Sequence, residues 1–235
     1  GCGWSVPVGN RRVLIDGGPN DSVMTCLGGI FPHWERTIDL VIISHTDADH
    51  ITGLVSVLGS YRVLQILAAY SSCETQICRK LEGLIREREI PVWKASSGGR
   101  LLLGDSEMKI IWPEENCHLG TNNCSIVGLL DFSEFGALFP GDIEERGQKA
   151  IFAKGFIIPN VELLKVPHHG ADCLWGPFLA SANPQLSVIS VGKNSYGHPT
   201  VPTLDKLKAS GSKIFRTDRA GTIESVSDGK SWWVK

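Results

Sequence analysis

The segment that most constrains this chain is VIISHTDADHITGL, residues 41–54. A short apolar run ends at Ser44, and the apolar spacing after it predicts a helix that begins at Ile51. Between the two stand four side chains that can bind a metal: His45, Asp47, Asp49 and His50. Because alternate residues of an extended loop project to the same side, the first three can converge while His50 points to a second position. A helix N-cap would use only one of these groups, so the pattern favours two adjacent cations.

Polar side chains also follow other predicted strands. One aspartate ends the strand of RRVLIDGG, another ends that of FGALFPGD, and a double histidine follows LLKV. The full set is Asp16, Asp142, His168, His169 and His198. Each one alone is unremarkable, but loops at one end of a scaffold are where catalytic groups gather. Together with residues 45–50 they predict a single site.

Apolar strands alternate with helices along most of the chain. Strands are expected at 11–18, 40–44 and 61–70, in short apolar runs between 91 and 142, and in VELLKV and LSVISVG. Helices are expected at 51–58, 76–89, near 144–154 and at 199–210. KIFRTD, Arg219-Ala220-Gly221 and TIESVS predict a closing hairpin. Strands at both ends with helices between them indicate two packed sheets flanked by helices, in one domain over residues 1–235.

The amino-acid composition excludes few classes of protein. The hydrophobic content of 42% and charged content of 20% are ordinary for a globular chain, and no apolar run is long enough to span a bilayer. Residue 1 is Gly and not Met, so we expect a part of a longer protein. The net charge is −2, but residues 186–235 carry eight Lys or Arg against four Asp or Glu, which leaves −6 on the rest. A basic segment beside a cation-binding body can hold a phosphate backbone, although a solvated surface explains the same numbers.

The seven cysteines do not form the Cys-x-x-Cys pairs of a structural zinc site. Cys73 with Cys78, or Cys117 with Cys124, could pair in an oxidising compartment. The odd count argues against a complete disulfide framework, so we expect buried free thiols.

The order of these motifs resembles a known family. His-x-Asp-x-Asp-His after an apolar strand is similar to the His-x-His-x-Asp-His signature of the metallo-β-lactamase superfamily, with Asp47 in place of the second His. The blocks FPGDIEE, LLKVPHHG, VGKNSYGHP and FRTDRAGTI follow in the order of the C-terminal metallo-β-lactamase-like domain of the ComEC family. That family forms the membrane channel of bacterial DNA uptake. The match runs from about Arg12 to Ser225.

The resemblance implies an α/β fold, an αββα sandwich of two mixed sheets flanked by helices, with a two-metal hydrolytic centre. It implies degradation of the non-transforming strand of incoming DNA during natural competence. The implied partners are single-stranded DNA and the channel region of the same parent protein, a bacterial inner-membrane protein. Two departures stand out: Trp4 lies where the family has Asp, and residues 121–125 lack the superfamily's His, with His118 just upstream.

The residues themselves allow a ligand assignment. The ligands of one cation would be His45, Asp47 and Asp142. Those of the other would be Asp49, His50, the same Asp142, and either His168 or His169. A carboxylate can bridge two cations about 3.5–4 Å apart, the spacing of two-metal hydrolases. Because Asp47 replaces a His, the set is rich in oxygen, which favours Mn²⁺, with Zn²⁺ as the alternative.

Other residues have expected roles around these cations. Asp49 would orient the attacking water, and His198 and Lys193 would bind the phosphate or protonate the leaving oxygen. Asp16 would brace the site by accepting N–H bonds from residues 45–50. The residues expected to contact DNA are Lys193, Tyr196, Arg216 and Arg219. No small-molecule cofactor is expected.

Two alternatives stay open. The same scaffold hosts many hydrolases of small esters, lactones or thioesters. Trp4 and the missing third histidine instead motivate a catalytically weak domain that binds single-stranded DNA and guides it to a channel.

Overall fold

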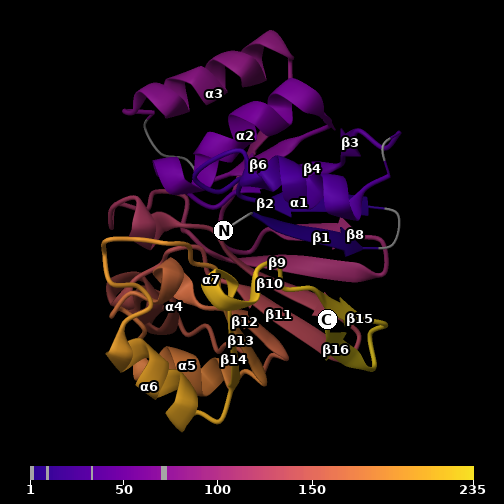
Figure 1. Cartoon of the computed structure of the whole chain (residues 1–235). Helices are drawn as coiled ribbons and strands as arrows, with labels where there is room; N and C mark the ends of the chain where they lie inside the picture. Colours follow the sequence, from indigo (N-terminus) through magenta and orange to yellow (C-terminus); the bar gives the residue numbers. More distant parts are fainter. Residues whose placement is uncertain (1–2, 9–10, 33, 70–72) are drawn as a thin grey trace. The chain divides into compact units, whose positions relative to one another are not determined.

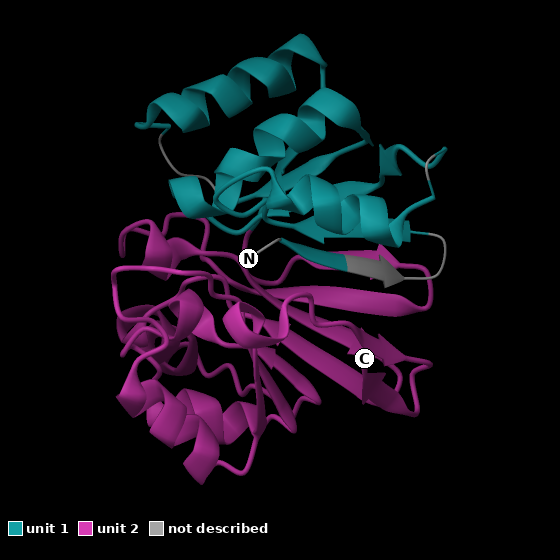
Figure 2. Cartoon of the chain, viewed as in Figure 1, with its two compact units in different colours: residues 1–95 teal, residues 96–235 magenta. Residues whose placement is uncertain are grey.

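The computed structural model describes residues 3–8, 11–32, 34–69 and 73–235 (Figure 1). The chain divides into two compact units, residues 1–95 and residues 96–235 (Figure 2). The interpretation of the whole chain as one functional domain stays a prediction. Among the described helices, none is long and apolar enough to cross a bilayer.

The first unit is built on a mixed five-stranded sheet in the order β1-β2-β4-β6-β7. β1 pairs antiparallel with β2, and the other four strands run parallel. A short parallel pair, β3 with β5, lies apart from this sheet. The strands are β1 Trp4–Val8, β2 Arg11–Ile15, β3 Thr37–Ile38, β4 Leu40–Ile43, β5 Arg62–Val63, β6 Ile66–Ala68 and β7 Val92–Lys94. The helices are α1 Ser22–Ile30, α2 Ala48–Ser60 and α3 Gln76–Glu87.

The buried core of the first unit explains how its sheet and helix α2 pack together. All four residues of β4 are buried, as expected of a parallel strand covered on both faces. α2 packs Leu54 and Leu58 into the same apolar cluster as Leu14 and Val41. Burying side chains of this size contributes about 1.5–3 kcal/mol each. The sheet and α2 therefore form the rigid support from which the segment after β4 projects.

The second unit contains a seven-stranded mixed sheet in the order β14-β13-β12-β11-β10-β9-β8. β8 to β11 form an antiparallel meander, and β11 to β14 run parallel. The strands are β8 Arg100–Leu103, β9 Ser106–Trp112, β10 Val127–Phe132, β11 Phe135–Phe139, β12 Leu163–Lys165, β13 Leu186–Ile189, β14 Lys213–Arg216, β15 Ser225–Ser227 and β16 Trp232–Val234. The helices are α4 Glu145–Ala153, α5 Gly176–Ala182, α6 Val201–Ala209 and α7 Thr217–Ala220, with short 3₁₀ turns η1 Asn122–Cys124 and η2 Pro167–Gly170.

The core of the second unit lies on this sheet. Leu138, Leu164 and Ile189, from three adjacent parallel strands, share one buried cluster with Phe178 of α5 and Leu207 of α6. Truncation of a buried Phe costs about 3–5 kcal/mol, so α5 is a structural element of this unit. The parallel strands place their carboxyl ends, with the polar residues that follow, along one edge.

Three local expectations were wrong. α2 begins at Ala48 and not at Ile51, because Asp47 adopts an extended conformation and takes the N-cap position. The closing hairpin does not include KIFRTD: β14 joins the large sheet beside β13, and the hairpin is β15 with β16. The strand expected at 61–70 is split into β5 and β6, and Tyr70 lies outside the described residues.

The expectation of free thiols was wrong for five cysteines, of which Cys26 is one. Disulfides join Cys73 to Cys78 and Cys117 to Cys124, with Cα–Cα separations of 5.3 and 5.8 Å. These separations lie within the range that a disulfide can bridge. Cys173 is free among the described residues.

Candidate metal centre

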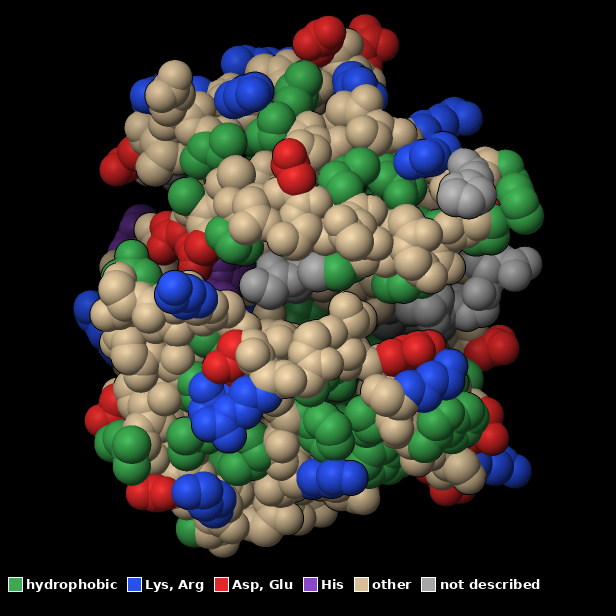
Figure 3. All heavy atoms as spheres, in the orientation of Figure 1, with side chains coloured by type: hydrophobic (Ala, Val, Ile, Leu, Met, Phe, Trp, Pro, Cys, Tyr) green, Lys and Arg blue, Asp and Glu red, His purple; other side chains and the backbone are tan. Residues whose placement is uncertain are grey.

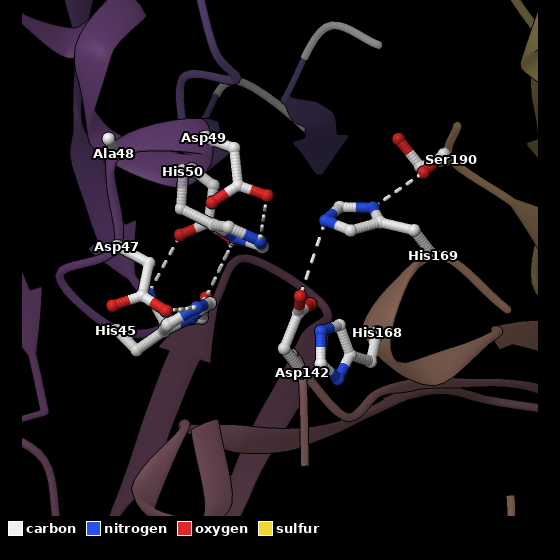
Figure 4. Close-up of polar contacts among 12 residues, drawn as sticks. His45, Asp47, Ala48, Asp49, His50, Asp142, His168, His169 and Ser190 are labelled. Carbon is white, nitrogen blue, oxygen red and sulfur yellow. Dashed lines mark hydrogen bonds and ion pairs between the residues drawn. The ribbon is translucent and has the colours of Figure 1, made fainter. Parts of the chain in front are cut away.

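The first ligand set lies where β4 ends and α2 begins (Figure 4). His45 and His50 are buried, with side chains 2% and 3% exposed, whereas Asp47 and Asp49 are about half exposed. Asp47 Oδ2 lies 3.7 Å from His45 Nε2, and Asp49 Oδ2 lies 3.9 Å from His50 Nε2. Buried imidazoles beside exposed carboxylates are suited to bind a cation that enters the site from solvent. Asp49 stands in the first turn of α2, where a negative charge is favoured by the helix dipole.

Asp16, at the end of β2, orients this set. Its Oδ1 accepts the backbone N–H of Ser44 at 2.8 Å, and its Oδ2 accepts the Ser44 hydroxyl at 2.7 Å. Oδ2 also lies 2.8 Å from His50 Nδ1. When His50 Nδ1 donates to this carboxylate, its Nε2 carries the lone pair that a metal requires. Metal-binding histidines almost always donate their other N–H in this way.

The charge of Asp16 is stabilised within this network. Burial by itself raises the pKa of the carboxyl, but the neighbouring His50, His45 and Ser44 outweigh it, and the pKa lies below its usual value. Asp16 is thus held as an acceptor and keeps Ser44 and His50 in place.

Two glycines allow the Asp16 loop to approach α2. The backbone N–H of Gly17 donates to the carbonyl of His50 at 2.7 Å, and that of Gly53 donates to Gly18 at 3.0 Å. A Cβ at Gly53 would lie 2.1 Å from the Gly17 carbonyl oxygen. The sequence IDGG…HITG therefore encodes a close contact between the loop after β2 and the first turns of α2.

The second ligand set lies in the other unit, at the carboxyl ends of β11 and β12 (Figure 4). Asp142 is 2% exposed, and its Oδ2 lies 3.2 Å from His169 Nε2. His169 Nδ1 lies 2.7 Å from the Ser190 carbonyl oxygen, so Nδ1 is the protonated nitrogen and Nε2 carries the lone pair. His168 points elsewhere, with its Nδ1 3.3 Å from Glu144 Oε1. The geometry therefore favours His169 over His168 as a ligand.

Backbone conformation separates these two histidines. His168, His169 and Gly170 all have positive φ, at 47°, 53° and 83°. Consecutive non-glycine residues in this region are uncommon and carry a steric cost. The left-handed turn makes the two imidazoles diverge, with ring centroids 6.3 Å apart.

The chain is 27% identical to the ComE operon protein 3 of Bacillus subtilis over 193 residues, which cover 80% of this chain and 24% of that protein. It is 26% identical to the competence protein ComA of Neisseria gonorrhoeae over 232 residues, which cover 95% of this chain and 31% of that protein. Among solved structures it is similar to the metallo-β-lactamase fold protein YhfI of Bacillus subtilis, with a TM-score of 0.61 and 14% identity, over 99% of this chain and 91% of that one. No family model matches the chain.

This chain is a metallo-β-lactamase fold protein related to the competence proteins. The α/β fold with mixed sheets flanked by helices, and the resemblance expected from the sequence, are confirmed. The chain spans less than a third of the length of either competence relative.

In this metallo-β-lactamase fold, the loop after β13 carries His198, Lys193 and Tyr196. Asn194 organises the loop: its Oδ1 accepts the backbone N–H groups of Tyr196 and His198 at 3.1 and 3.0 Å. The His198 ring lies 5.7 Å from that of His168 between centroids. Burial, followed by His168 and His169, lowers the pKa of His198. Tyr196 is 81% exposed, and Lys193 is exposed in the same loop.

Arg216 and Arg219 line a cavity of about 460 Å³ formed by α6, β14 and α7, together with Lys208 and Phe215. Arg216 donates through Nε and Nη2 to both carboxylate oxygens of Asp218, at 2.9 and 2.6 Å. On the face seen in Figure 3, Lys and Arg side chains are interspersed with Asp and Glu.

The structure shows which residues lie beside the positions that depart from the family pattern. Trp4 lies in β1 opposite Ile15. In the turn η1, Asn122 and Asn123 each donate a side-chain N–H to Glu144, at 3.3 and 3.0 Å. His118 is exposed.

Sequence reasoning missed three residues that contact the candidate site residues: Ser44, Glu144 and Lys165. Ser44 links Asp16 to the strand that carries His45, and Glu144 contacts His168. Lys165 lies 3.2 Å from Asp142. A lysine in the apolar strand LLKV was a usable signal, since lysine is almost never fully buried unless it is paired.

Proposed function

We propose that this chain is a metal-dependent phosphodiesterase that acts on DNA and degrades the non-transforming strand during DNA uptake. The observation that carries the proposal is the orientation of its imidazoles. His50 Nδ1 is held by a carboxylate and His169 Nδ1 by a backbone carbonyl, the outer contacts that metal-binding histidines require. The relation to competence proteins supports DNA as the substrate.

The donor set fits a divalent cation. Asp47, Asp49 and Asp142 supply carboxylate oxygens, and His45, His50 and His169 supply imidazole nitrogens. Oxygen ligands suit Mn²⁺, whereas imidazole also suits Zn²⁺. The two ligand sets belong to different compact units. We propose that both sets bind metal in one centre, and the order of motifs in the sequence supports this proposal.

A divalent cation held by these residues would supply Lewis-acid activation of water and neutralise charge on the phosphate. Asp49, exposed at the first turn of α2, accepts a hydrogen bond from the attacking water and orients it. His198 and Lys193, in the loop after β13, bind the phosphate or protonate the leaving oxygen. Asp16 holds His50, and Ser190 holds His169, so that each ligand keeps its tautomer.

Digestion assays test this function. Labelled single- and double-stranded DNA, a chromogenic phosphodiester and a lactone are incubated with the protein and Mn²⁺ or Zn²⁺. We expect cleavage of DNA and of the phosphodiester, abolished by Asp49→Ala and unchanged by Asp105→Asn, a variant of an exposed turn residue. Cleavage of the lactone alone would instead identify a small-ester hydrolase.

A second function has one observation in its favour. Asn122 and Asn123 occupy the region where the superfamily has a histidine, and they bind Glu144 instead. A domain with a weakened metal centre could bind single-stranded DNA without cutting it. Binding of single-stranded DNA that is independent of metal, with no cleavage under any condition above, would establish this alternative.

Variants from each ligand set test whether both serve one centre. His50→Ala and Asp142→Asn alter different units. If the sets act together, each variant abolishes tight Mn²⁺ binding measured by calorimetry. If Asp142→Asn left the affinity unchanged while His50→Ala removed it, Asp142 would be excluded from the centre.

A further inference from the structure

The most unusual charged residue in the second unit is Lys165, the last residue of β12. It is 3% exposed, its Nζ donates to the Gly141 carbonyl at 2.8 Å, and it lies 3.2 Å from Asp142 Oδ1. Removing an ammonium from water is costly unless it is paired and hydrogen-bonded. The Asp142 carboxylate supplies that pairing.

The two oxygens of Asp142 consequently have different surroundings. Oδ1 faces the Lys165 ammonium, and Oδ2 lies 3.2 Å from His169 Nε2. The Asp142 backbone N–H donates to Ser125 Oγ at 3.2 Å, which holds the backbone of this residue in place. A carboxylate that bridges two cations through both its oxygens presents one oxygen to each. Here a fixed positive charge already stands beside one of them.

We propose that Lys165 is a positioning residue that restricts Asp142 to a single metal. Its ammonium occupies the approach to Oδ1 and repels a second divalent cation, so that Asp142 offers only Oδ2, to the cation shared with His169. This inference rests on the proposed metal-dependent function, and it replaces the bridging role that the sequence predicted for Asp142. Lys165 thereby supplies, as part of the fold, positive charge that a second cation would otherwise supply.

The electron paramagnetic resonance spectrum of Mn²⁺ tests this inference without an activity measurement. Isolated Mn²⁺ gives a six-line signal, whereas two Mn²⁺ ions bridged by a ligand are exchange-coupled and give a different, multiline spectrum. With two equivalents of Mn²⁺, we expect the parent protein to show only the six-line signal. Lys165→Met should show the coupled spectrum and bind its second Mn²⁺ at least tenfold more tightly in calorimetry.

The matched control is Lys154→Met, which removes an exposed lysine that pairs with Glu114 and should behave as the parent does. A coupled spectrum in the parent, or identical binding curves for parent and Lys165→Met, would overturn the inference. Should Lys165→Met not fold, the parent spectrum still decides between one and two bridged ions. Absence of any Mn²⁺ and Zn²⁺ binding by the parent would instead refute the proposed metal-dependent function.

Discussion

Asp16 Oδ2 lies 2.8 Å from His50 Nδ1, and both residues are buried. The contact joins the end of β2 to the first turn of α2, and it directs the Nε2 lone pair of His50 away from the carboxylate. Residues separated by 34 positions thus determine together how one ligand is presented.

Replacement of this carboxylate should weaken metal binding without unfolding the protein. Asp16→Asn keeps the size of the side chain but removes the charge that orients His50. We expect the affinity for Mn²⁺, measured by calorimetry, to fall about 10–100-fold. Asp21→Asn, an exposed change in the same unit, is the control. Equal affinities for parent and Asp16→Asn would remove Asp16 from the metal centre.

The contact of Gly53 with the Asp16 loop predicts opposite effects for two alanine substitutions in α2. Gly53→Ala places a Cβ 2.1 Å from a backbone oxygen, whereas a Cβ at Gly59 meets nothing within 4 Å. Gly59→Ala should raise the free energy of unfolding by about 0.5–1 kcal/mol through helix propensity. Gly53→Ala should lower it by about 1–3 kcal/mol because the loop must move. Urea denaturation measures both, and a stabilising Gly53→Ala would contradict the close contact.

Because His168 lies in a left-handed turn, the free energy of unfolding should depend on the shape of the side chain at position 168. Asn tolerates positive φ, whereas a β-branched side chain does not. We expect His168→Val to be less stable than His168→Asn by about 1–2 kcal/mol. The measurement is urea denaturation of protein treated with a chelator. Equal stabilities would argue that residue 168 is not left-handed.

Cys173 should be unreactive in the folded protein. Burial, with further contributions from Glu144 and Asp142, raises the pKa of its thiol from 9.0 to about 12. The thiolate is the nucleophile, so its fraction at pH 8 is about a thousandfold smaller than for an unperturbed thiol. Because the folded-state pKa is raised, the neutral thiol favours the folded state at neutral pH, and this contribution is lost as pH rises from about 9 toward 12. Alkylation of metal-free protein, followed by mass spectrometry, should label Cys173 at pH 8 only after unfolding; rapid labelling of the folded protein would contradict this.

Arg216 and Arg219 should contribute unequally to DNA binding. Arg216 is already paired with Asp218, so Arg219 is the stronger candidate for a phosphate contact. We expect Arg219→Ala to flatten the log–log salt dependence of single-stranded DNA affinity by about 0.7, the value for one phosphate contact. Arg216→Ala should change the slope less. Unchanged affinity and slope in both variants would exclude this segment from the DNA path.

Much of the fold followed from local pattern. The buried strand β4, the amphipathic helix α3 and the individual strands β8 to β11 lie where the pattern of apolar residues predicted them. The start of α2 did not, because Asp47 can end an extended loop or begin a helix, and the periodicity of apolar residues starts only at Ile51. α1 and α5 were not anticipated, since short helices rich in small residues have weak periodicity.

The limits of sequence reasoning at the candidate site are also physical. Residues of one short loop, such as His45 and His50, could be assigned to a site because few positions separate them. The choice between His168 and His169 depends on backbone dihedrals, and the pairing of Lys165 with Asp142 depends on strand order. Disulfide pairing likewise needs Cα separations that spacing along the chain does not provide. Each of these requires three-dimensional coordinates.

The left-handed run from His168 to Gly170 has a consequence for how this protein changes over generations. Both histidines occupy backbone conformations that glycine or asparagine adopts more readily. A single-base change converts a histidine codon to an asparagine codon, so selection for stability alone would steadily remove both imidazoles. A lineage that no longer needs the chemistry of His169 should lose it early, while the apolar strands around it persist. The residue at position 169 in any descendant would therefore record whether its site is still in use.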